Sequence, residues 1–136
     1  MSITEDYVSY EVAKLLKEKG FNCPCRVVYS PKGIIKHYLK EEVYGHNLKG
    51  HKKLCPTLQM AMKWLREVHH LYIDVGFGND DKGEFLYMGD IYDLTNDAIH
   101  GIYKPIIEAD DYLFYNPKNY EEACEAALKY SLEHLI

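Results

Sequence analysis

Three segments of the chain carry apolar side chains at the three- and four-residue spacing of a helix with one buried face. The pattern predicts helices over about residues 9–19, 58–70 and 120–135. Each begins near a residue whose side chain can accept hydrogen bonds from the first free backbone N–H groups, namely Ser9, Thr57 and Asn119. The residues expected to face a core are Val8, Val12, Leu15 and Leu16; Leu58, Ala61, Met62, Leu65 and Val68; and Ala123, Cys124, Ala127, Leu128, Ser131 and Leu135.

Between the helices, runs of β-branched and aromatic residues alternate with turn residues and predict strands. Segments 26–30 and 34–39 flank a Pro-Lys-Gly turn, and segments 71–77 and 84–94 flank a turn rich in Gly, Asn and Asp, so each pair predicts a hairpin. Weaker strands are expected at 102–107 and 112–115, and a loop at 40–55. The order α-β-β-α-β-β-(β)-β-α predicts an α+β fold, in which a small antiparallel sheet of about four to six strands is packed by three helices.

Length and composition are those of a single folded domain. The chain has 136 residues, of which 47% are hydrophobic, and 13 tyrosines. The first residues lack the basic start and apolar run of a signal peptide, and no apolar stretch approaches the roughly 18 residues that span a bilayer. We therefore expect one domain over residues 1–136, a cytoplasmic location, no membrane contact and four free cysteine thiols.

Charge is divided unevenly along the chain. Residues 1–70 hold 12 Lys+Arg against 7 Asp+Glu, a balance of +5, whereas residues 71–136 hold 4 against 14, a balance of −10. Such a division is typical either of a binding half beside a solubilising half or of two mutually attractive faces of one domain.

The three helical segments also resemble a known group of proteins. SYEVAKLLKEKGF, PTLQMAMKWLREVH and YEEACEAALKYSLEHLI are similar to segments of a family of small uncharacterised proteins from Bacteroides-type gut anaerobes and their phages and mobile elements. The resemblance covers about a third of the chain. It implies a bacterial or phage cytoplasmic setting, an accessory role and a helical scaffold, and it carries no activity, cofactor or catalytic residue to this sequence.

The motifs that commit a chain to a reaction are missing from this sequence. Cys23-Pro24-Cys25 has one residue between its cysteines, where a zinc clip normally has two, and no second clip follows. There is no Gly-x-Ser-x-Gly elbow, no His-Glu-x-x-His and no glycine-rich phosphate loop. We therefore expect no metal and no cofactor, and a small enzyme or zinc site using Cys25, Cys55 and nearby histidines is the third-ranked hypothesis.

The first-ranked hypothesis is a non-catalytic accessory protein that binds a protein partner, or a second copy of itself. Tyrosine brings large contact area with a polar tip to interfaces, and the acidic half of the chain is rich in it. The alternative for these residues is an ordinary half-buried strand surface. The candidate binding residues are Tyr87, Asp90, Tyr92, Asp93, Asp110, Asp111 and Tyr112.

The second-ranked hypothesis is nucleic-acid or nucleotide binding through residues 32–53. This segment holds six lysines against Glu41 and Glu42, with histidines and tyrosines among them, and such a mixture can bind phosphate and stack on bases. The net charge of −5 and the single arginine near the segment favour solvated surface lysines instead. The candidate phosphate-binding residues are Lys36, Lys40, Lys49, Lys52 and Lys53.

Overall fold

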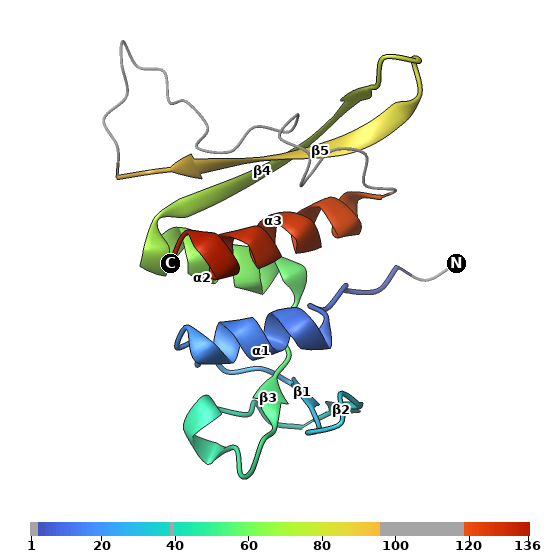
Figure 1. Ribbon diagram of the computed structural model, residues 1–136. Coiled ribbons are helices and arrows are strands. Elements are labelled where there is room, and N and C mark those ends of the chain that lie inside the picture. Colours follow the sequence, from blue (N-terminus) through green and yellow to red (C-terminus); the bar gives the residue numbers. More distant parts are fainter. Residues whose placement is uncertain (1–2, 39, 96–118) are drawn as a thin grey trace. The chain divides into compact units, whose positions relative to one another are not determined.

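The computed structural model describes residues 3–38, 40–95 and 119–136, and within them the chain is α+β, as predicted (Figure 1). Two compact units, Met1–Ala61 and Met62–Ile136, are described separately below. The elements are α1 (Tyr10–Glu18), β1 (Val27–Tyr29), β2 (Ile35–His37), the 3₁₀ turn η1 (Gly45–Asn47), β3 (Lys53–Leu54), α2 (Leu58–His69), β4 (Leu71–Asn79), β5 (Phe85–Asp93) and α3 (Tyr120–His134).

All three predicted helix starts are confirmed by capping hydrogen bonds. The Ser9 hydroxyl accepts from the N–H of Val12 at 3.2 Å, and the Asn119 side-chain oxygen accepts from the N–H of Glu122 at 2.7 Å. The Thr57 hydroxyl does the same for α2 at 3.1 Å. Each cap satisfies a backbone donor that the first helical turn leaves without a partner. Among the described helices, none combines the length and apolar character that crossing a bilayer requires.

The first unit packs α1 and a three-stranded antiparallel sheet of order β2-β1-β3 around a small core (Figure 1). The predicted hairpin is confirmed, with Val28 opposite Lys36. All of β1 is buried, whereas all of β2 is exposed. The Tyr29 hydroxyl donates a buried hydrogen bond of 2.7 Å to the carbonyl of Val8, just before the helix. The core side chains include Val8, Val12, Leu16, Val27, Val28, Leu54 and Cys55.

Residues 40–55 are more ordered than the predicted loop. They contain η1 and β3, and Val43 exchanges two backbone hydrogen bonds, of 2.9 and 2.7 Å, with Cys25. A strand of two residues is too short to show an alternating pattern, so only its pairing with β1 defines it.

In the second unit, the β4–β5 hairpin packs against α3, and α2 leads directly into β4 (Figure 1). The buried face of α3 is almost the predicted one, except that Leu132 is buried where Leu135 was expected. In α2, Val68 was expected to be buried and is 55% exposed. The His69 ring packs edge-on against Trp64, with ring centroids 4.7 Å apart, while His70 is exposed.

The described strands form two sheets, of three and two strands, where one sheet of about four to six strands was predicted. The predicted strands at 102–107 and 112–115 lie outside the described residues. The single domain over residues 1–136 stays a prediction.

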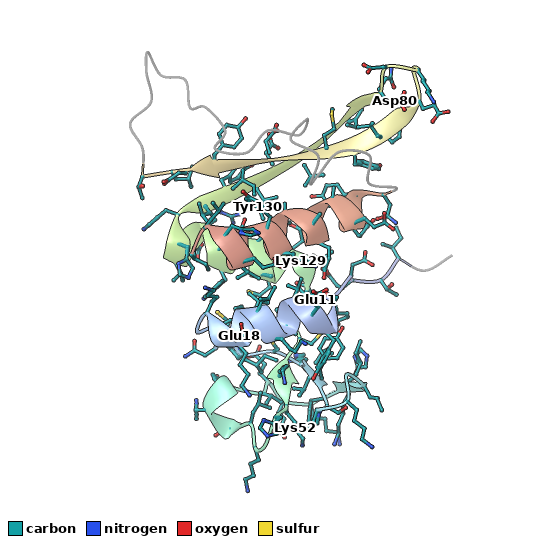
Figure 2. The ribbon with its side chains drawn as sticks, viewed as in Figure 1. Glu11, Glu18, Lys52, Asp80, Lys129 and Tyr130 are labelled. Carbon is teal, nitrogen blue, oxygen red and sulfur yellow. The ribbon has the colours of Figure 1, made fainter. Side chains whose placement is uncertain are left out.

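Both hairpins turn through the same hydrogen-bond arrangement. Asp80 accepts backbone N–H groups of Lys82 and Glu84 on one carboxylate oxygen, at 2.9 and 2.8 Å. In the first hairpin the Ser30 hydroxyl accepts from the equivalent positions, at 3.2 and 3.1 Å. Gly33 and Gly83 each have φ of +80°, a backbone conformation that glycine adopts without steric cost. The carboxylate of Asp80, at the end of the hairpin in Figure 2, is therefore engaged in the turn.

Candidate functional site

The β4–β5 hairpin presents two different faces because side chains alternate along each strand. The nine cross-strand pairs put Leu71, Ile73 and Ile91 on one face with Tyr87 and Asp93. This face packs against α3, where the rings of Tyr87 and Tyr120 meet edge-on with centroids 6.0 Å apart. The opposite face carries Tyr72, Asp74, Leu86, Met88, Asp90 and Tyr92, of which Leu86 is buried.

Two cross-strand pairs on that opposite face form a small acidic aromatic surface, which we call the tyrosine–aspartate face: Tyr72, Asp74, Asp90 and Tyr92. Tyr72 pairs with Tyr92, with ring centroids 6.4 Å apart, and Asp74 pairs with Asp90 in the next outward-facing position. Tyr72 and Asp74 are exposed, and Asp90 and Tyr92 are half-buried. Like charges directly opposed across a strand pair repel each other.

The turn end of the hairpin carries a second aromatic cluster, the aromatic tip, formed by Phe77, Phe85 and Tyr87. The rings of Phe77 and Phe85 are stacked with centroids 5.9 Å apart, and Phe85 meets Tyr87 edge-on at 5.1 Å. Phe77 is 74% exposed and Phe85 is 60% exposed. Two large apolar rings held together in water are the kind of surface that a partner protein covers.

The structure separates the residues predicted for an acidic, tyrosine-rich face. Asp90 and Tyr92 lie on the tyrosine–aspartate face, whereas Tyr87 and Asp93 lie on the face that packs against α3. Asp93 accepts from the hydroxyl and the N–H of Thr95, at 2.6 and 2.9 Å, and these hydrogen bonds lower its pKa. The predicted residues Asp110, Asp111 and Tyr112 lie outside the described residues.

Sequence reasoning missed four of the residues that complete these two surfaces. Tyr72 and Asp74 join the site because the hairpin register places them opposite Tyr92 and Asp90. Phe77 lies opposite Tyr87, and Phe85 lies opposite Asn79, so Phe77 and Phe85 are diagonal neighbours on the same face. Counting outward from the turn residues would have found all four.

The predicted phosphate-binding lysines are partly brought together in the first unit. Lys49 and Lys52 line a cavity of about 280 Å³ with Tyr38, Asn47, Glu41 and Glu42. Lys36 lies over the Tyr38 ring, with its Nζ 5.0 Å from the ring centroid. Lys53 instead lies over Tyr10, at 5.3 Å, and donates a hydrogen bond of 2.7 Å to the carbonyl of His51. Lys40 is exposed and does not line the cavity.

The third hypothesis involved Cys25 and Cys55, which line a second, mainly apolar cavity of about 180 Å³. Cys25 is 7% exposed, and burial, together with nearby Cys55 and Cys23, raises its pKa to about 12. A thiol with that pKa stays protonated at neutral pH, whereas a catalytic cysteine acts as the thiolate. His37, one of the histidines near Cys25 in the sequence, is paired with Val27 and packs edge-on against Tyr7, with ring centroids 5.9 Å apart.

The described residues contain no group of three or more His, Cys, Asp or Glu side chains placed to hold one metal ion. Comparison with protein-family models, with curated proteins and with solved structures found no match to this chain. The resemblance of the helical segments to the Bacteroides-type family stays a prediction.

Proposed function

We propose that the protein is a non-catalytic accessory protein that binds a basic protein partner through the β4–β5 hairpin. The observation that carries the proposal is the pair of exposed, stacked rings of Phe77 and Phe85 in the aromatic tip. Burying exposed aromatic side chains contributes strongly to many interfaces, because each one removes a large apolar area from water.

The charge around these rings defines the chemistry of the partner. Asp80, Asp81 and Glu84 lie in the turn beside them, opposed only by Lys82. Asp74 and Asp90 extend the negative surface along the strands. A partner with arginine or lysine side chains around an apolar pocket would meet both features, and opposite charges would also accelerate its association.

A second copy of the chain is a poorer partner for this surface. If two hairpins docked face to face through a twofold axis, the same carboxylates would meet across the interface. Like charges brought together in this way oppose association. The acidic hairpin therefore favours a different, basic protein over symmetric self-association.

The experiment is a pull-down with the full chain as bait and cell lysate as the source of partners. Phe77→Thr/Phe85→Thr removes both rings but keeps residues that suit a strand. The matched control is Ile34→Thr, which removes a 65%-exposed apolar side chain from the other hairpin. Circular dichroism checks that each variant is folded.

The proposal expects a partner that wild type and the Ile34 variant retain and that the double Phe variant loses. Truncation of an anchoring aromatic residue typically costs about 2 kcal/mol or more of binding free energy, so retention should fall at least tenfold. Neutralising Asp74 and Asp90 should shift partner elution to lower salt. A partner that all variants retain equally would contradict the proposal, and so would a chain that elutes as a dimer and captures nothing.

A further inference from the structure

A cavity of the first unit lies outside the β4–β5 hairpin. The cavity of about 280 Å³ lined by Tyr38, Glu41, Glu42, Val43, Asn47, Leu48, Lys49 and Lys52 is called the lysine hollow here. Its volume is near the lower end of the roughly 300–1,000 Å³ of small-molecule sites. Polar and apolar side chains share the lining, as they do in sites that orient a ligand with a charged group and a ring.

Hydrogen bonds of the backbone hold the walls of the lysine hollow in place. Val43 is fixed by its two hydrogen bonds to Cys25, at the start of the strand that forms the centre of the sheet. Tyr38 is fixed by its N–H, which donates to the carbonyl of Arg26 at 2.7 Å. The Lys52 carbonyl accepts from Lys17 of α1 at 3.2 Å, which ties the far wall to the helix. Figure 2 shows Lys52 in this loop region beside β3.

The charged side chains of the lysine hollow do not neutralise one another through ion pairs. Lys49 and Lys52 line the same cavity as Glu41 and Glu42, yet within the described chain no ion pair joins any of these four side chains. Between residues 36 and 52 four lysines stand against these two glutamates, so the local balance is +2 while the chain as a whole carries −5. A small anion gains from a local positive potential of this kind.

Tyr38 adds an aromatic residue to the lining. Its side chain is half-buried, and the Lys36 ammonium lies over the ring at 5.0 Å from the centroid. A cation over an aromatic ring is held there by the ring's negative face. A planar base can stack on tyrosine in the same way that bases stack on the aromatic platforms of single-strand-binding proteins.

We propose that the lysine hollow binds a nucleoside monophosphate. The phosphate lies between the ammonium groups of Lys49 and Lys52, and the base stacks on Tyr38. Glu41 and Glu42 accept hydrogen bonds from ribose hydroxyls or from the exocyclic amine of the base, because an ionised carboxylate is a hydrogen-bond acceptor and not a donor. A short ligand fits this site better than a polynucleotide, because the acidic side chains within the hollow oppose a second and third phosphate.

The test is titration of the full chain with adenosine 5′-monophosphate, followed by isothermal calorimetry and by ¹H–¹⁵N chemical shifts. We expect a dissociation constant below about 1 mM, and shifts at residues 38, 41–43, 47–49 and 52. Lys49→Ala/Lys52→Ala should weaken binding at least tenfold. The matched control is Lys32→Ala/Lys82→Ala, which removes the same charge from two exposed hairpin turns and should change affinity less than twofold.

Two further comparisons distinguish the contribution of the Tyr38 ring to binding from that of the phosphate group. Tyr38→Leu should weaken adenosine 5′-monophosphate by roughly tenfold, the scale of one base–tyrosine stack, and leave ribose 5-phosphate unchanged. The proposal is overturned if ribose 5-phosphate binds wild type as tightly as the nucleotide, or if both lysine pairs weaken binding equally. A single-stranded RNA octamer that binds more than tenfold tighter than the mononucleotide would overturn it in favour of a polynucleotide surface. Chemical-shift changes confined to residues 62–95 would show that the nucleotide binds outside the lysine hollow and would overturn the proposal.

Discussion

Asp74 and Asp90 are directly paired across the β4–β5 hairpin, so two carboxylates share one face of the strands. Directly opposed like charges cost a sheet about 0.2–1 kcal/mol. Asp74→Asn should therefore raise the free energy of unfolding in urea by that amount and weaken partner binding at the same time. Asp81→Asn, in the exposed turn, removes one charge without relieving the pair and is the stability control. An Asp74→Asn chain that unfolds more easily than wild type would contradict the expectation.

The Cys25 thiol makes stability depend on alkaline pH. Its pKa is raised by burial to about 12 from an ordinary 9.0, so the folded chain keeps it protonated where the unfolded chain ionises it. Its contribution to stability is complete below pH 9 and is lost between pH 9 and 12. We expect the urea midpoint to fall over this range, and to fall less steeply in Cys25→Ala. Equal slopes for both chains would show that another group governs the loss.

Burial should also rank the four thiols by reactivity. Cys25, Cys55 and Cys124 are buried and Cys23 is half-buried, and burial raises the pKa of Cys124 to about 11. Iodoacetamide at pH 8 should therefore modify Cys23 first, and the other three only in urea. Peptide mass spectrometry reads the order directly. Rapid modification of Cys25 in the folded chain would revive the nucleophile hypothesis that its environment opposes.

The hydrogen bond from the Tyr29 hydroxyl to the Val8 carbonyl fixes the start of α1 over β1 in the first unit. Tyr29→Phe removes this donor and leaves the buried Val8 carbonyl with the weaker Cys55 thiol, whose Sγ lies at 3.7 Å. The expected loss is about 1–3 kcal/mol of unfolding free energy, measured in urea. Tyr10→Phe is the control, because the Tyr10 hydroxyl donates to the Pro31 carbonyl at an exposed position. Similar losses in the two variants would argue against burial as the cause.

Thr95 controls the acidity of Asp93. Its hydroxyl and N–H both donate to one Asp93 oxygen and stabilise the ionised carboxylate, so the pKa lies below its ordinary 3.8. A lowered pKa contributes stability that is present above pH 3.8 and is lost as the pH falls through the folded value. Thr95→Val keeps the N–H and removes the hydroxyl, so the pKa of Asp93 should rise. A carboxyl ¹³C titration measures it, and an unchanged value would remove the hydroxyl as the cause.

The helices and both hairpins could be predicted because their signals are local. Ser9, Thr57 and Asn119 cap the helices that their sequence context indicates, and the glycine-containing turns fall where the hairpins reverse. The division into two sheets and the short strand β3 could not be predicted from the sequence. Lys53 and Leu54 form a strand only because they pair with Tyr29 and Val28. Distant pairing of this kind leaves no period in the sequence.

The candidate sites were predictable only as far as composition allowed. Asp90 and Tyr92 stood out by residue type, but Tyr72 and Asp74 belong with them through the register of the hairpin alone. The same register moved Tyr87 and Asp93 to the other face. For the lysines, charge identified the segment, and only the cavity that the structure forms there separated Lys49 and Lys52, which line it, from Lys53, which lies over Tyr10.

In both hairpins, the residues that set the strand register differ from the residues that determine the chemistry of the exposed turn. One oxygen at the first turn position and a glycine three residues later define the reversal, and a serine hydroxyl serves as well as a carboxylate. The side chains of the two positions between them, Pro31-Lys32 in one hairpin and Asp81-Lys82 in the other, take no part in these hydrogen bonds and face solvent. Substitutions there can alter what the end of a hairpin recognises while every strand pair stays aligned, so the binding preferences of this chain can diverge without refolding it.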